Sequence, residues 1–117
     1  PNRPRRRSRP DRPPWEDPGV RHARFDVAFL SIEGVDVPLR AGYLLVAESD
    51  DPRRPQWECI AYGIDTAPLA PARHPVAIAT LDGRRLVGDA VVVRSVEGAH
   101  VLRGDGPLDG IVDADLA

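Results

Sequence analysis

Residues 35–48, "VDVPLRAGYLLVAE", decide the fold, because apolar side chains recur in them at every second position. The odd positions are all apolar: Val35, Val37, Leu39, Ala41, Tyr43, Leu45 and Ala47. Alternation with a period of two is typical of a β-strand, whose successive side chains point to opposite faces. We predict one long strand with its odd positions buried throughout, its even positions exposed at first and covered from Leu44 onward, and a bend at Gly42. Strands that bend in this way serve both sheets of a sandwich or close a barrel.

Other β-prone runs surround this one, and no window predicts an amphipathic helix. Further strands are predicted at residues 24–32, 56–62, 76–81, 86–96 and 99–103. Three dipeptides that favour tight hairpin turns join neighbouring runs, and they are Glu33-Gly34, Asp82-Gly83 and Glu97-Gly98. The sequence therefore predicts an all-β domain, a small antiparallel meander of about six strands that forms a barrel or a sandwich.

Two of these predicted strands also carry expectations about burial. In residues 24–32, Phe25, Val27 and Phe29 fall on one face and are predicted to pack in the core. In residues 86–96 both faces are apolar, which is typical of a central strand that is covered on both sides.

The first nineteen residues differ from the rest in composition and charge. They contain six prolines, which remove amide donors and disfavour both helix and strand. They hold six arginines against three acids, a net charge of +3, while residues 20–117 hold ten arginines against fifteen acids, a net charge of −5. We expect residues 1–19 to be a basic Pro/Arg-rich arm, disordered unless bound, beside a single β-domain of residues 20–117. The residues predicted to bind a partner are Arg3, Arg5, Arg6, Arg7, Arg9, Arg12 and Trp15.

The overall composition bounds the class of protein. A chain of 117 residues with 42% apolar and 29% charged residues is typical of one globular domain. No apolar run approaches the ~18 residues that cross a bilayer, and no secretory signal segment is evident, so we expect a cytoplasmic protein without a membrane partner. All sixteen basic residues are arginine, which indicates a GC-rich bacterial or phage genome.

Candidate catalytic and metal-binding residues are few. Cys59 is the only cysteine and lies inside a predicted strand, where a thiol usually packs as a small apolar residue. His22, His74 and His100 are far apart in the sequence and form no metal-ligand motif. Four aspartates near the C-terminus have spacings of four, four and two residues, which do not fit a calcium-binding loop. We therefore predict no catalytic residue, no metal site and no cofactor.

Two loop regions invite a functional interpretation. The longest predicted loop, residues 65–75, is the best place for a small-ligand site, with Asp65 and His74 as its candidate residues. Residues 101–110, "VLRGDGPLDG", contain an Arg-Gly-Asp triplet. Their glycines and Pro107 instead predict a strand exit and closing turn, in which the proline ends the pairing.

These features favour a non-catalytic interaction or structural subunit of a larger assembly, which grips a protein partner with its basic arm. The first alternative is a nucleic-acid-binding accessory protein, whose arginines neutralise phosphates and whose aromatic side chains, such as Trp57 or Tyr62, stack on bases. Against it, the body is acidic and no basic stripe is evident. The second alternative is a small-ligand-binding or enzymatic barrel that uses the loop at residues 65–75.

Overall fold

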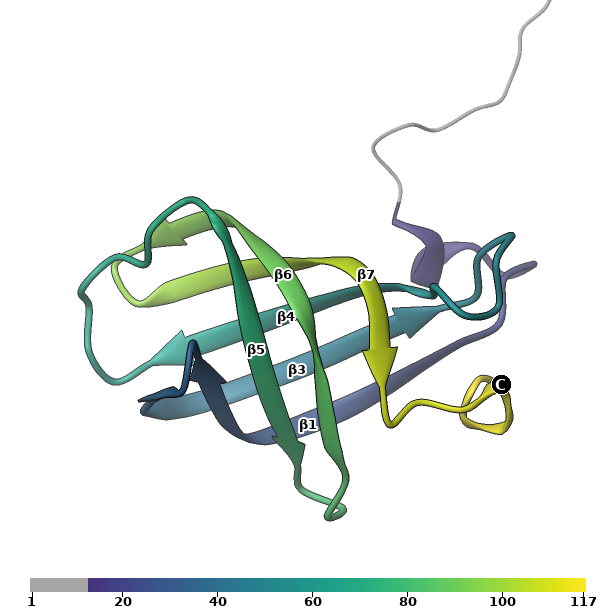
Figure 1. The fold of residues 1–117 in the computed structure, drawn as a ribbon, viewed down its shortest axis with the longest axis horizontal. Coiled ribbons are helices and arrows are strands. Elements are labelled where there is room, and N and C mark those ends of the chain that lie inside the picture. Colours follow the sequence, from purple (N-terminus) through teal and green to yellow (C-terminus); the bar gives the residue numbers. More distant parts are fainter. Residues whose placement is uncertain (1–12) are drawn as a thin grey trace, which may run out of the picture.

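Seven β-strands and two single-turn 3-10 helices make up the part of the chain that the computed structural model describes, residues 13–117 (Figure 1). The strands are β1 (His22–Ile32), β2 (Val35–Val37), β3 (Leu39–Ala47), β4 (Gln56–Gly63), β5 (Arg73–Thr80), β6 (Arg85–Val96) and β7 (Ala99–Asp109). The 3-10 helices are Pro14–Glu16 and Asp113–Asp115. Within the described residues no helix is long and apolar enough to cross a membrane.

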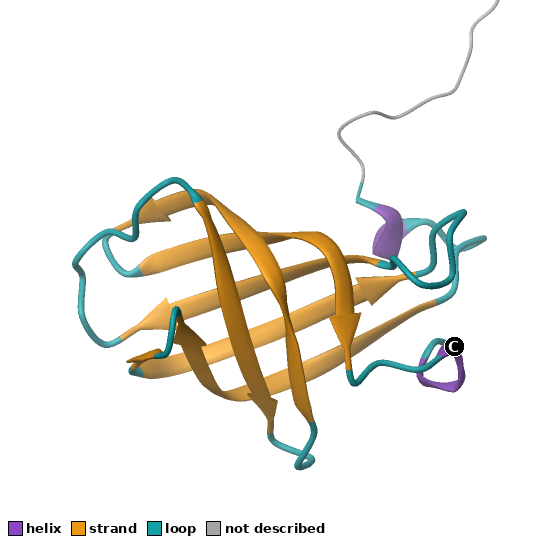
Figure 2. Cartoon of the chain, in the orientation of Figure 1, coloured by secondary structure: helices purple, strands orange, loops and turns teal. Residues whose placement is uncertain are grey.

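Six of the strands form a closed antiparallel barrel (Figure 2). Their order is β1-β3-β4-β7-β6-β5, and β5 pairs back onto β1 to close the ring, while β2 is an extra strand on the edge of β1. The prediction of an all-β fold is confirmed, and of the two predicted architectures the chain adopts the barrel. All three predicted hairpin turns are present, and in two of them a glutamate and a glycine both have positive φ, 52° and 80° at Glu33-Gly34 and 50° and 87° at Glu97-Gly98.

Apolar side chains fill the interior of the barrel. The most deeply buried are Leu30, Leu44, Val46, Trp57, Cys59, Ile78, Leu86 and Leu102. β6 contributes only one of its faces to this core, because Val87 and Val93 on the other face are 40% and 45% exposed. The predicted burial of both faces of residues 86–96 is therefore wrong, since no second layer covers the outside of the barrel.

A β-bulge in β1 reverses the faces that the sequence pattern assigned to it. The ladder between β1 and β5 shifts register between Val27 and Phe29, so Ala28 is an extra residue. After the bulge Leu30 points into the barrel and Phe29 points outward, where it is 73% exposed. The prediction that Phe29 packs in the core is wrong, whereas Val27 is buried and Phe25 packs at the edge of the core.

A second bulge and a proline divide the long strand predicted at residues 35–48. β2 pairs with β1 only as far as Val37, because the next residue, Pro38, has no amide proton. The ladder between β3 and β4 then shifts register between Leu39 and Ala41, so Arg40 is extra. The even positions Leu44 and Val46 consequently point into the core, so their predicted burial is confirmed, whereas the predicted burial of the odd positions is wrong for most of the strand.

β7 is much longer than the strand predicted at residues 99–103. It pairs with β4 as far as Arg103, bends through residues 104–107, and pairs again with β6 at Leu108 and Asp109. Residues 105–107 have no partner in the ladders with β4 and β6, but the strand continues beyond Pro107. The predicted strand exit and closing turn is thus a bend within one strand, and it is this bend that shapes the surface described next.

Candidate functional site

The predicted partner-binding residues divide between the described and the undescribed parts of the chain. Trp15 lies within the described residues and is half-buried. The six arginines of the arm lie outside them, and these are Arg3, Arg5, Arg6, Arg7, Arg9 and Arg12. The described part of the arm begins at Pro13, at its base, and it is this part that lies beside the barrel.

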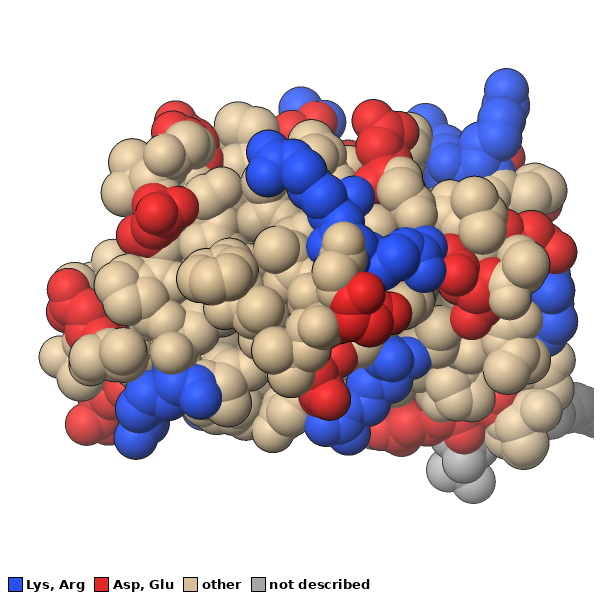
Figure 3. Space-filling model, turned by 90° about the horizontal axis from the view of Figure 1, so that it is seen from below, with Lys and Arg blue, Asp and Glu red and all other residues tan. Residues whose placement is uncertain are grey.

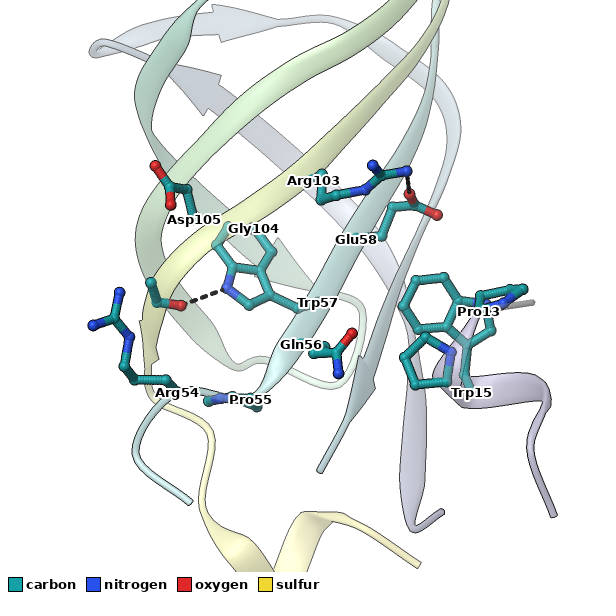
Figure 4. A pocket seen from close by; sticks show the side chains of 12 residues that line it. Pro13, Trp15, Arg54, Pro55, Gln56, Trp57, Glu58, Arg103, Gly104 and Asp105 are labelled. Atoms are coloured by element: carbon teal, nitrogen blue, oxygen red, sulfur yellow. Dashed lines mark hydrogen bonds and ion pairs between the residues drawn. The ribbon is translucent and has the colours of Figure 1, made fainter. Parts of the chain in front are cut away.

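A groove of about 690 Å³ lies at the base of the arm (Figure 4). We call it the arm-base groove, and it is lined by residues 13–15, 54–58 and 103–106. Figure 4 shows Pro13 and Trp15 on one side of β4, and Gly104 and Asp105, in the bend of β7, on the other. The arm and the body of the protein thus each supply one wall.

Local structure fixes the wall that comes from the arm. Pro13 is extended, with φ −68° and ψ 149°, and its carbonyl accepts a hydrogen bond from the amide of Glu16, which closes one 3-10 turn. Proline suits the first positions of such a turn because its φ is already set and its missing amide proton is not needed there. The turn packs against β1 and β3, so Trp15 is held in place beside the barrel.

Trp57 supports the opposite wall of the groove, which is the bend of β7. Its indole is 2% exposed, and its Nε1 donates a hydrogen bond to the carbonyl of Gly106 at 3.1 Å. The ring lies directly beneath Gly104, where an added β-carbon would stand only 2.2 Å from it. Trp57 therefore supports the bend of β7 from inside the barrel, and because it is buried it offers no free face on which a base could stack.

Charges in the arm-base groove are balanced. Two arginines, Arg54 and Arg103, face two acids, Glu58 and Asp105. Arg103 lies 3.5 Å from Glu58, and Asp105 lies 2.9 Å from Arg73 on β5. Both charged residues of the Arg-Gly-Asp triplet are thus engaged in ion pairs within the domain.

The face of the described domain that Figure 3 shows carries no large area of one charge. Figure 3 shows a face on which basic and acidic side chains are interspersed and separated by uncharged residues. On this face no basic stripe is present of the kind that a polyphosphate chain would require.

The C-terminal segment braces the barrel next to the groove. The Arg21 guanidinium contacts Glu48 at 3.2 Å and Asp113 at 2.5 Å, and Arg84 contacts Asp115 at 2.6 Å. Hydrogen bonds from Arg84 and from the amide of Val112 hold the pKa of Asp115 below its usual value. Two of the four spaced aspartates therefore bind arginines and the backbone. No local pattern in the sequence predicts these ion pairs, because the partners lie 92 and 31 residues apart along the chain.

The residues considered for catalysis or metal binding are dispersed. Burial raises the pKa of the Cys59 thiol to about 12, so it stays protonated at neutral pH. His22, His74 and His100 each contact different residues, and among residues 13–117 no group of three or more potential ligands could hold a metal ion.

The candidate ligand loop is shorter than predicted, because β5 begins at Arg73 and leaves residues 64–72 as the loop. His74 therefore lies in a strand, where it contacts Glu33 and the carbonyl of Ala70. Asp65 stays in the loop and accepts a hydrogen bond from the amide of Ala67 at 2.9 Å. The structure does not bring the two candidate residues together through any contact between their side chains.

The chain matches no protein-family model, no curated protein and no solved structure.

Proposed function

We propose that the protein is a non-catalytic interaction subunit of a larger assembly, which holds an extended segment of a protein partner between its basic arm and the arm-base groove. One observation carries the proposal: the arm and the bend of β7 form the two walls of the same groove. A segment that contacts the arginines of residues 1–12 would continue directly into this groove, because the arm joins the domain at its rim.

The lining of the groove favours a peptide. It combines a half-buried tryptophan, three prolines and two half-buried glycines with one neutral amide side chain, Gln56. Aromatic-lined grooves suit extended peptides, above all proline-rich segments, whose polyproline-II backbone is stiff before binding and whose carbonyls accept hydrogen bonds. The paired charges of Glu58 and Arg103 favour such a chain over a polyphosphate, since neither sign is in excess.

The barrel supports this function as a rigid frame. Its interior is filled, and the bend of β7 is fixed from inside by Trp57, so the groove is formed before a partner arrives. A preformed site loses less conformational entropy on binding than one that must be ordered. The arm then adds charge attraction, which accelerates encounter with an acidic partner and weakens as salt is added.

The test is an affinity capture from cells of the source organism, with the full-length chain, a Δ1–12 chain and Trp15→Ala as baits and quantitative mass spectrometry as the readout. The proposal expects one set of proteins to be captured by the full-length bait, lost with Δ1–12 and reduced about tenfold or more with Trp15→Ala, because a tryptophan that a partner covers is often a dominant contact. Leu81→Ala is the matched control, since it removes a side chain that is 71% exposed in the β5–β6 turn, outside the groove. Equal capture by all four baits would contradict the proposal.

The same experiment can also show that the captured partner is a nucleic acid. If nuclease treatment abolishes capture, and binding of a defined oligonucleotide falls steeply with salt, the arm acts on phosphates and the accessory-protein alternative replaces the proposal.

A further inference from the structure

The outer surface of β4 leads from the arm-base groove onto an apolar part of the barrel. Along β4 the odd positions are buried and the even positions point outward, as expected for a strand with one face in the core. The first two outward side chains, Gln56 and Glu58, line the groove (Figure 4). The next two are Ile60 and Tyr62. A chain that lies in the groove along β4 would therefore meet apolar side chains next.

Strand pairing places the outward side chains of β3, β4, β7 and β6 in rows across the barrel. The first row beyond the groove contains Tyr43, Ile60, Val101 and Arg94. The second contains Ala41, Tyr62, Ala99 and Val96. We call these eight residues the apolar rows, because Arg94 is the single charged residue among them. The ion pair of Glu58 and Arg103 lies between the apolar rows and the rest of the groove.

The apolar rows are open to solvent. Ile60, Tyr62 and Val101 are partly exposed, and Val96 is 48% exposed. Within residues 13–117 no second layer of structure covers the outside of the barrel. Contiguous apolar side chains on a surface often mark a place where another protein binds.

Two tyrosines in the apolar rows are held in a fixed arrangement. The Arg24 guanidinium lies over the ring of Tyr43, 4.3 Å from its centroid. The rings of Tyr43 and Tyr62 are 6.1 Å apart and meet edge to face at 76°. Both are favourable geometries for aromatic rings. The apolar rows thus present an aromatic surface that is formed before a partner arrives.

The size of the apolar rows suits an extended peptide better than a second copy of the chain. Two rows across four strands cover roughly 250 Å², from a strand spacing of about 4.8 Å and a row spacing of about 6.8 Å. Each partner in a standard interface between two folded proteins buries about 800 Å². The outside of a closed barrel is also convex, so a second barrel would touch only part of this area. One extended segment along β4 would cover Ile60 and Tyr62 directly.

We propose that the apolar rows continue the arm-base groove, and that the partner segment is bipartite. Its acidic stretch meets the arm, and its aliphatic or proline side chains lie on Ile60 and Tyr62. The inference rests on the proposed function, because the segment reaches the apolar rows through the groove.

Charge separates the two ends of this segment. Residues 1–12 hold six arginines and one acid, a net charge of +5, so they attract acids. The apolar rows hold no acid and one arginine, and their tyrosines and aliphatic side chains favour apolar contacts. Proline suits this end because its extended backbone is stiff before binding and packs on aromatic rings.

Selection from a library of random peptides displayed on phage, with the full-length protein as bait, tests the chemistry of the segment. The peptides must reach Tyr62, which lies about 20 Å beyond Gln56 along β4. Enriched peptides are expected to carry acids towards one end and aliphatic or proline residues towards the other. Enrichment of acids alone, or a library that yields no binder, would contradict the inference.

The affinity of one enriched peptide, measured by fluorescence anisotropy, locates its apolar end. Ile60→Thr and Tyr62→Thr are each expected to weaken binding about tenfold, the effect of losing one important contact, while threonine keeps the preference for a strand. Tyr62→Phe is expected to bind like the wild type, because it keeps the ring. Phe29→Thr is the matched control, since it removes a side chain that is 73% exposed on β1, outside both surfaces. Thermal unfolding of each variant verifies that the barrel is intact.

Trp15→Ala and Δ1–12, measured with the same peptide, separate this inference from the proposed function. Weaker binding with these two variants and with Ile60→Thr supports both. Weaker binding with Trp15→Ala and Δ1–12 alone would overturn the inference and leave the arm-base groove as the whole site. Weaker binding with Ile60→Thr alone would contradict the proposed function, and the bipartite segment with it.

Discussion

The backbone of Gly104 rests on the indole ring of Trp57, so closely that a β-carbon on residue 104 would stand 2.2 Å from the ring. These residues come from β7 and β4, which separate beyond the pair Glu58 and Arg103. The indole fills the space between the separating strands and bonds to Gly106. The glycine of the Arg-Gly-Asp triplet is therefore explained by packing, and the wall of the arm-base groove depends on it.

Replacing Gly104 tests this relationship. Gly104→Ala is expected to reduce the free energy of unfolding by about 2 kcal/mol or more, because overpacking against a buried ring forces the backbone to shift. Gly19→Ala is the control, since a β-carbon there meets only a side-chain oxygen at 3.4 Å. Chemical denaturation followed by fluorescence measures both, and equal stability of the two variants would show that the bend does not depend on Trp57.

The bulge in β1 predicts opposite results for two adjacent large apolar residues. Leu30→Ala is expected to cost about 2–5 kcal/mol of unfolding free energy, because Leu30 is 2% exposed in the core. Phe29→Ala is expected to change stability by about 0.5 kcal/mol or less, because Phe29 is 73% exposed. Thermal and urea unfolding measure the difference. The reverse order would mean that β1 lacks the bulge and keeps the simple alternation of its sequence.

The ion pair between Arg84 and Asp115 predicts a pH-dependent contribution to stability. The pKa of Asp115 is lowered, so its contribution is present above the ordinary value of 3.8 and is lost as pH falls through the lowered value. Asp115→Asn is expected to destabilise the protein by about 1 kcal/mol at pH 7 and to equal the wild type in strongly acid solution. Asp113→Asn is the control, because that carboxylate is 72% exposed and its effect should be smaller. A difference for Asp115→Asn that does not change with pH would contradict the account.

Cys59 predicts a reactivity pattern. Its thiol is fully buried and its pKa is raised to about 12, so iodoacetamide at pH 8 is expected to modify it only when the barrel unfolds. The modification rate should equal the rate for the urea-unfolded chain, which is the positive control, multiplied by the equilibrium fraction of globally unfolded protein, because refolding is fast relative to alkylation. Rapid modification of the folded protein would show local opening of β4.

Which segments form strands could be predicted from sequence, but which faces are buried could not. Alternation in residues 35–48 and the Glu-Gly turns are local signals, and both correspond to strands and turns in the structure. The bulges at Ala28 and Arg40 are set by ladders with β5 and β4, and a single extra residue exchanges the buried and exposed faces. No local pattern in the sequence predicts that exchange of buried and exposed faces.

The candidate site was predictable in part for the same reason. The prolines and charge of the arm are local features and singled out Trp15 as a contact residue. The opposite wall depends on Trp57 lying under Gly104, two residues that are 47 positions apart in the sequence. Their contact exists only because β4 and β7 are neighbours in the barrel.

The central claim, that a partner lies in the arm-base groove, is tested most directly by site-specific photo-cross-linking. A photoreactive amino acid is placed at Gln56, on the floor of the groove, or at Phe29, an exposed apolar position on β1 outside it, and the protein is irradiated in its source cells. The account predicts a cross-linked protein at position 56 that disappears when residues 1–12 are deleted, and no such product at position 29. A product at position 29 alone, or one at position 56 that survives the deletion unchanged, would contradict it.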